Sequence, residues 1–427
     1  MSRLFPATLR LGLAGVICAT LAAAGDATFL LRGATIHTVS SAVIEHGDLL
    51  VRDGKIAGIG SKLSAPKGVR VIEARGLHVY PGIIDSATEI GLTEIGAVRE
   101  TSDTNELGSL NPQLRAAVAV NPASEHIPVT RANGITSVMT LPQGAMLAGQ
   151  AALIHLDGWT SEEMAFVPDA AMMLHFPIVQ ISRSRFSRGN PVTYPEAKKN
   201  FEQQIRELEE FFESARRYQK ARQAHAPGFT TDLKFEAMLP LLEGKIPLMV
   251  EAVREKPIRE ALRFADKEKV RMVLAHGEEA WKVAGELKAR NIPVILGPTL
   301  ALPLDEDDPY DRLFTAPGEL SKAGVKIAFG SFSSEFSRNL PYQAAAAVAF
   351  GLSHDEALKA ITLYPAQIWG VADRIGSIEE GKWADLMVTD GDPLEAPTQV
   401  KQLFIKGSPV DLDNKQKRLY EKYLNRP

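Results

Sequence analysis

Four short apolar segments decide the fold of this chain: IPLMVEA at residues 246–252, RMVLAH at 271–276, IPVILG at 292–297 and VKIAFG at 325–330. Each is short and rich in Val, Ile and Leu, which favours a β-strand. Stretches with helical patterning lie between them, at 257–266 and 278–290. Short strands that alternate with helices are typical of a parallel sheet built from βα units.

Four further segments upstream are predicted to be strands of the same sheet, at 79–85, 136–141, 151–156 and 171–176. Helices are predicted at 194–225, where the many charged residues form a solvated face, and at 355–362. Eight strands with intervening helices predict an α/β fold of the (β/α)8 barrel type, over residues 77–376. Such a barrel carries its chemistry at the C-terminal ends of its strands.

The two ends of the chain are predicted to form a second, smaller unit. Short strands at 29–38, 48–52 and 55–59 include the hairpin signal Asp53-Gly54, because both central positions of a tight hairpin turn need a positive φ. Further strands are predicted at 384–389 and 402–405. Two half-sheets are each too small to be stable alone. We therefore expect residues 25–76 and 377–410 to meet in one β-sandwich, followed by a helical tail at 411–427.

The first 24 residues have the pattern of a cleaved signal peptide. Arg3 and Arg10 precede an apolar run that ends in Ala22-Ala23-Ala24, a small-residue cleavage site. The alternative is an uncleaved anchor helix, but the run is short for a membrane span. The lone cysteine, Cys18, lies inside this run, so the mature chain is predicted to contain no thiol. We expect a periplasmic or secreted protein whose mature chain has no membrane span.

Composition excludes several classes of protein. The chain has 427 residues, of which 45% are hydrophobic and 23% are charged, which is typical of a globular protein and not of a disordered one. The net charge is −4 without a basic block, so no nucleic-acid partner is predicted. A small-molecule substrate or ligand is the expected partner.

Several motifs carry a resemblance to a known family. Tyr80-Pro81-Gly82-Ile83-Ile84-Asp85, Leu274-Ala275-His276-Gly277 and Lys382-Trp383-Ala384-Asp385-Leu386 occur in this order along nearly the whole mature chain. The succession resembles the amidohydrolase superfamily, in particular its imidazolonepropionase-like branch. The resemblance implies a metal-dependent barrel with a split β-sandwich that hydrolyses carbon–nitrogen bonds.

The metal ligands that the resemblance implies are mostly replaced in this chain. The family places two histidines spaced i,i+2 after the first strand, one histidine each at the ends of the fifth and sixth strands, and an aspartate at the end of the eighth. The corresponding residues here are Ser86 and Thr88, Glu251, His276 and Phe332. Hydroxyls are poor neutral ligands of zinc and a phenyl ring has no donor. The resemblance therefore implies a degenerate metal site.

Glu251 and His276 are the candidate catalytic residues. Glu251 is predicted to be a general base or metal ligand, and His276 a ligand or proton donor. Together they can hold one divalent metal, zinc or similar, or none. Residues expected to contact substrate are Ser86, Thr88, Arg131, His175 and Ser331.

For three residues a purely structural role is the alternative to a place in the site. His155 and His175 interrupt or end apolar runs, so each is either a residue of the barrel mouth or a core histidine bonded to the backbone. Arg131 either clamps a substrate carboxylate or packs against a helix end.

Two functional classes follow from these residues. The first is a hydrolase of non-peptide carbon–nitrogen bonds in amides, lactams or dipeptide-like substrates, working through the reduced site. The second is a catalytically inactive relative that binds a small molecule or supports an active paralogue. Association with a paralogue or with a second copy of the chain fits either class.

Overall fold

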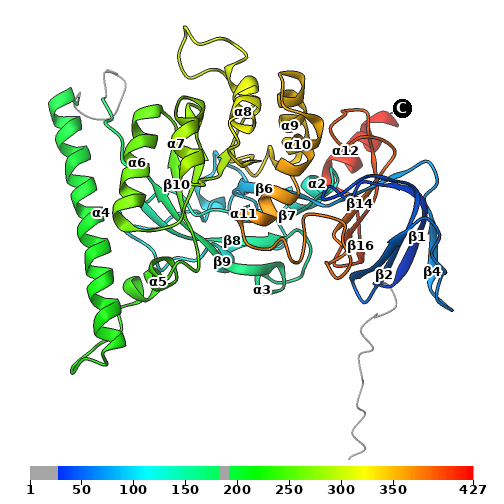
Figure 1. Cartoon of the computed structure of the whole chain (residues 1–427), viewed down its shortest axis with the longest axis horizontal. Coiled ribbons are helices and arrows are strands. Elements are labelled where there is room, and N and C mark those ends of the chain that lie inside the picture. The colour runs from blue at the N-terminus through cyan, green and yellow to red at the C-terminus, as the bar shows by residue number, and fades with distance from the viewer. Residues whose placement is uncertain (1–26, 182–191, 427) are drawn as a thin grey trace, which may run out of the picture.

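The structure is a computed structural model that describes residues 27–181 and 192–426. Its central sheet is an eight-stranded, nearly closed barrel (Figure 1). The strands lie in the order β13-β12-β11-β10-β9-β8-β7-β6. The edge strands meet beyond the end of β13, where the backbone N–H of Phe332 donates to the carbonyl of Ala87 at 2.7 Å. The bounds are β6 (Ile83–Thr88), β7 (Ile135–Thr140), β8 (Leu147–His155), β9 (Ala165–His175), β10 (Leu248–Ala252), β11 (Met272–His276), β12 (Val294–Leu296) and β13 (Ile327–Phe329).

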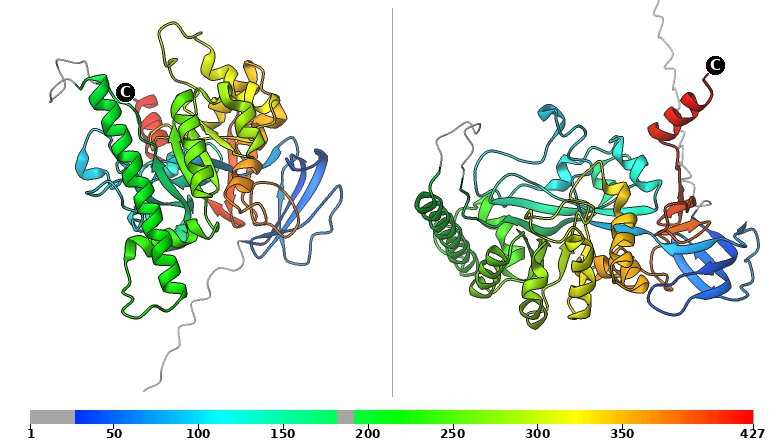
Figure 2. Two further views of the ribbon diagram at one scale, coloured as in Figure 1. Left: turned by 60° about the vertical axis from the view of Figure 1, so that its left-hand side comes forward. Right: turned by 90° about the horizontal axis from the view of Figure 1, so that it is seen from above.

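Helices stand along one side of these strands, as the right-hand view of Figure 2 shows. The predicted helices at 194–225, 257–266 and 355–362 are confirmed as α4, α6 and α10, and the one at 278–290 divides into a short 3-10 helix and α7. Outward-facing strand residues such as Leu248 and Leu274 pack in one buried cluster with helix residues such as Ile258. The bounds are α4 (Tyr194–Gln223), α5 (Leu233–Leu242), α6 (Glu255–Glu268), α7 (Ala284–Ala289), α8 (Arg312–Lys322), α9 (Leu340–Ala349), α10 (His354–Ala360) and α11 (Leu363–Ile368).

The prediction of an all-parallel barrel is wrong at one strand. Strand β8 is antiparallel to both of its neighbours, β7 and β9, whereas the other seven strands share one direction. The physical reason is loop length. Only residues 141–146 join β7 to β8, and a parallel pair needs a crossover of about a dozen residues or more. The end of β8 therefore lies at the opposite end of the barrel from the ends of its neighbours.

The second sheet joins both ends of the chain, in the order β16-β15-β14-β5-β1-β2-β3, with β4 also paired to β1. The sheet curls on itself, so that Phe29 and Phe404 stack at 4.4 Å between ring centroids. The hairpin at Asp53-Gly54 is confirmed, with φ values of 50° and 76°. The bounds are β1 (Phe29–Ile36), β2 (Ile44–Arg52), β3 (Lys55–Gly60), β4 (Arg70–Glu73), β5 (His78–Pro81), β14 (Leu386–Thr389), β15 (Val400–Ile405) and β16 (Ser408–Val410).

Gly82 marks the crossing between the two sheets. The predicted strand at 79–85 is divided here into β5 of the curled sheet and β6 of the barrel. The Gly82 N–H donates to the carbonyl of Asp385 at 2.8 Å. A Cβ atom on Gly82 would lie 2.1 Å from Thr136 Oγ1, so only glycine allows the chain to pass so closely.

Two predictions at the chain ends meet the structure differently. The signal peptide at 1–24, with Cys18, lies outside the described residues. The predicted helical tail contains α12 (Lys415–Leu424), which has no buried residue and stands at the periphery (Figure 2). None of the helices within residues 27–181 and 192–426 is long and apolar enough to span a bilayer.

Candidate functional site

The candidate site is a row of three side chains at the ends of adjacent parallel strands. His175 ends β9, Glu251 lies near the end of β10 and His276 ends β11. Glu251 pairs in register with His175, and Ala252 with His276. Side chains alternate along a strand, and Met173 and Met249 pack in the barrel interior, so His175 and Glu251 point into the barrel mouth.

Glu251 lies between the two imidazoles. Its Oε2 atom accepts a hydrogen bond from His175 Nδ1 at 2.7 Å, and its Oε1 atom is 4.0 Å from His276 Nε2. His276 Nδ1 is 3.3 Å from Oε1 of Glu278. The exposed side-chain fractions of His175, Glu251 and His276 are 23%, 30% and 19%, so a small molecule can reach all three.

The electrostatics of the row favour an anionic base beside a cationic acid. Burial opposes ionisation of Glu251, but the hydrogen bond from His175 and the positive charge of His276 outweigh it and lower the pKa of this carboxyl. Burial likewise opposes protonation of His276, but its contacts with Glu278 and Glu251 outweigh burial and raise the pKa of the imidazole. Glu251 is therefore suited to accept a proton and His276 to donate one.

Phe332 closes one face of His276. The two rings stack at 3.8 Å between centroids, with an interplanar angle of 24°. Both residues have positive φ values, 67° for His276 and 50° for Phe332. A left-handed backbone is unusual for residues of this size and is held by the surrounding structure.

Two of the three predicted hydroxyl contacts, Thr88 on the first barrel strand and Ser331 after the last one, are bonded within the protein. Thr88 Oγ1 donates to the carbonyl of Ser333 at 2.9 Å, and Ser331 Oγ donates to the same carbonyl at 3.0 Å. Ser86 is fully buried, and its hydroxyl has no partner among the described residues. An irregularity between Asp85 and Thr88 disturbs the alternation that predicts i,i+2 side chains on one face. Substrate contact by these three residues stays a prediction.

Asp85 and Glu278 are functional candidates that sequence reasoning missed. Asp85 is fully buried and accepts hydrogen bonds from Ser337 Oγ at 2.6 Å and from the Ser331 N–H at 3.0 Å. Burial nevertheless raises the pKa of the Asp85 carboxyl to about 6. The available signals were an acid inside the apolar run of Ile83 and Ile84, and an acid two residues after His276.

The donor set does not fit a tightly held zinc ion. Within residues 27–181 and 192–426, no three His, Cys, Asp or Glu side chains gather where they could share a metal ion. His175 Nδ1 is bonded to Glu251, His276 Nδ1 faces Glu278, and Phe332 has no donor atom. Zinc sites in proteins use three or four such ligands.

Two predicted candidates lie away from this row. His155, at the end of the antiparallel strand β8, is buried and its Nε2 atom is 2.9 Å from Oδ2 of Asp385, the residue before β14. Arg131 ends α2 (His126–Arg131), ahead of β7, and donates to the carbonyl of Leu156 at 3.1 Å. Both therefore lie at the opposite end of the barrel from His276. His155 is a core residue bonded to a carboxylate and not to the backbone, and Arg131 bonds to the backbone just after β8.

Comparisons with known proteins agree with this architecture. A model of the amidohydrolase family matches residues 178–410, more than half of the chain. The chain belongs to this family. An amidohydrolase structure from Thermotoga maritima MSB8 is 30% identical with a TM-score of 0.79, and the match covers 90% of this chain and 99% of that one.

Curated relatives of this amidohydrolase match over smaller shares. Amidohydrolase tasK of Hapsidospora irregularis is 24% identical over 405 residues, which cover 85% of this chain but only 39% of tasK. An imidazolonepropionase of Thermoplasma volcanium is 32% identical over 133 residues, 30% of this chain and 32% of the relative. The chain thus spans about two fifths of the length of tasK, and its match to the imidazolonepropionase covers less than a third of that protein.

Proposed function

We propose that this amidohydrolase hydrolyses non-peptide carbon–nitrogen bonds by acid–base catalysis, without a tightly held zinc ion. The row of His175, Glu251 and His276 is the single observation that carries the proposal. It lies at the strand ends where enzymes with barrel folds keep their active sites. The opposite pKa shifts of Glu251 and His276 support the assignment, since perturbed pairs of this kind cluster at functional sites.

The proposed reaction needs one water molecule. Glu251 accepts a proton from this water, whose oxygen forms a bond to the carbonyl carbon. His276 donates its proton to the nitrogen as the carbon–nitrogen bond breaks. The proton on Glu251 then passes to His276 Nε2, which is 4.0 Å from Glu251 Oε1, and restores both groups. His175 holds the carboxylate in position through its hydrogen bond.

The substrate is expected to be an activated amide. Zinc lowers the pKa of its bound water from 15.7 to about 7, which is worth up to ~12 kcal/mol in the supply of hydroxide. One carboxylate and one imidazole do not replace that amount. A strained lactam or a cyclic imide lowers the barrier itself, and the partial match to an imidazolonepropionase supports a cyclic substrate.

The test is a panel of lactams, cyclic imides and dipeptides with the purified protein. We expect turnover that survives treatment with a chelator and falls by about 100-fold in the Glu251→Gln variant, the usual effect of removing a general base. His354→Ala changes an exposed histidine outside the row and serves as the matched control. Turnover that needs stoichiometric metal would contradict the proposal.

A second candidate function is ligand binding without catalysis, in which no substrate of the panel is turned over. The stacking of Phe332 on His276, at the position where the family keeps an aspartate, favours it. Thermal stabilisation by a metabolite without hydrolysis of that metabolite would support this function over the first.

A further inference from the structure

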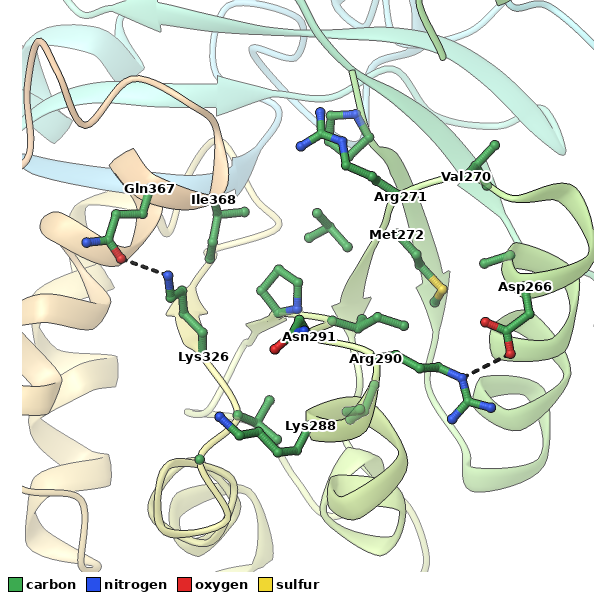
Figure 3. A pocket seen from close by; sticks show the side chains of 18 of the residues that line it. Asp266, Val270, Arg271, Met272, Lys288, Arg290, Asn291, Lys326, Gln367 and Ile368 are labelled. Carbon is green, nitrogen blue, oxygen red and sulfur yellow. Dashed lines mark hydrogen bonds and ion pairs between the residues drawn. The ribbon is translucent and has the colours of Figure 1, made fainter. Parts of the chain in front are cut away.

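We infer that a cavity at the floor of the barrel binds a small organic polyanion. The cavity has a volume of about 650 Å³ and lies at the N-terminal ends of β10 to β13, opposite the His175–Glu251–His276 row (Figure 3). Drug-sized ligands occupy sites of this size. The inference does not depend on the proposed hydrolysis.

Cations dominate the charged side chains of this cavity. Figure 3 labels four cationic side chains at the cavity, and Asp266 is the one acid among the lining residues. Of the five lining cations, three come from the turns that lead into β11 and β12, one from the end of α7, and the fifth stands directly before β13. The five cations are Lys269, Arg271, Lys288, Arg290 and Lys326. The whole chain has a net charge of −4, so this local excess of positive charge runs against the composition.

Four of the five cations have no acidic partner among the described residues. Arg290 alone is paired with the lining acid, with 3.0 Å between its Nε and Asp266 Oδ2. Lys326 Nζ bonds to the neutral side chain of Gln367 at 2.8 Å, and Arg271 donates to a backbone carbonyl at 3.1 Å. Like charges gathered without counter-charges repel one another, and a bound anion would relieve that repulsion.

Helix ends account for only part of this cluster. A cation at the C-terminus of a helix faces the negative end of the helix dipole, which explains Lys288 in the last turn of α7 and the C-cap residues Lys269 of α6 and Arg290 of α7. Arg271 and Lys326 lie outside the helices, one residue before β11 and β13. Their side chains add charge at the cavity where no helix terminus requires it.

The fixed turns and the apolar floor define the ligand further. Lys269 and Asn291 adopt φ values of 50° and 53°, and the Lys288 side chain lies against Gly324, whose added Cβ would be 3.3 Å from Nζ. Apolar side chains line the remainder, among them Met272, Ile292, Val325 and Ile368. The matching ligand has two or more negative groups on an apolar body, as in a nucleotide or an aromatic polycarboxylate.

The experiment is calorimetric titration of the full chain at low salt in metal-free buffer. ATP and trimesate test the two sources of negative charge, while tripolyphosphate and adenosine carry only the charge or only the ring. We expect ATP or trimesate to bind with at least about 10-fold higher affinity than either partial ligand, and to weaken as salt is raised.

Charge variants locate the site. The double variant Lys269→Glu, Lys288→Glu is expected to weaken binding by at least about 10-fold, and Lys269→Gln, Lys288→Gln gives a milder version if the first does not fold. Lys256→Glu, at the other end of α6, is the matched control. Absence of binding by both ATP and trimesate, equal binding of tripolyphosphate, or equal loss in the control would overturn the inference.

Discussion

Two histidine–carboxylate pairs lie on neighbouring strands of this amidohydrolase and differ mainly in their access to water. His155 on β8 meets Asp385 at 2.9 Å, and His175 on β9 meets Glu251 at 2.7 Å. The exposed side-chain fractions are 1% and 3% in the first pair and 23% and 30% in the second. Nearly the same contact therefore serves in two environments.

Strand direction explains the difference. Because β8 runs against β9, the C-terminal residues of the two strands lie at opposite ends of the barrel. His155 stacks on Phe166 at 4.1 Å between centroids, and its partner Asp385 belongs to the segment between the barrel and the curled sheet. The first pair joins two sheets, whereas the second faces the mouth. A histidine beside an acid thus indicates chemistry only where a ligand can reach it.

The largest expected effect comes from breaking the buried pair. Asp385→Ala removes the partner of His155 and also the acceptor of the Lys406 N–H, which lies 2.7 Å from Asp385 Oδ1. We expect the free energy of unfolding to fall by about 3 to 5 kcal/mol, as when one member of a buried polar pair is lost. Urea denaturation followed by circular dichroism measures it.

The matched change at the mouth is Glu251→Ala. It should cost less than about 1 kcal/mol of stability, since its partly exposed partners, His175 and His276, can bond to water. Equal losses of stability in the two variants would remove the distinction between a structural and a functional pair.

A third carboxylate sharpens the comparison because it has no imidazole partner. The folded-state pKa of Asp85 is raised to about 6 from 3.8, so folding favours its protonated form. Its stabilising contribution is therefore complete below about pH 4 and is lost as the pH rises through about 6, up to about 3 kcal/mol. Denaturation of the native protein at about pH 4 and about pH 7 should differ more than that of Asp85→Asn. Identical pH dependence in the two proteins would show that Asp85 ionises freely in the fold.

Sequence reasoning located the strands well because each is an apolar run with clear boundaries. It placed Glu251 and His276 on neighbouring strand ends, and the structure has them 4.0 Å apart. It did not give the direction of β8, which depends on a connection of six residues, 141–146, and not on the strand itself. The role of His155 could not be separated from that of His175 without this direction.

Contacts between side chains that lie far apart in the chain could not be predicted from the sequence. Asp85 is held by Ser337, 252 positions away along the chain, and no local pattern links the two. The floor cations are likewise spread from Lys269 to Lys326 and line one cavity only because the helix ends and strand starts that carry them share one end of the barrel. Glu278 carried a local signal, its position two residues after His276, and was missed because no motif required an acid there.

The smallest expected effect on turnover concerns the partner of the proposed base. His175→Ala removes the 2.7 Å hydrogen bond that contributes to the lowered pKa of Glu251, while burial, which acts in the opposite direction, remains. The pKa of Glu251 should rise, so the acidic limb of the rate profile moves to higher pH, and turnover at neutral pH should fall by about 10-fold. Steady-state kinetics across pH measures both, and His175→Gln, which keeps a side-chain donor, should restore part of the shift. A positioning role predicts that the profile moves together with the rate. A loss of rate with an unchanged acidic limb would instead place His175 in direct contact with substrate, which is a different use of the same exposed pair.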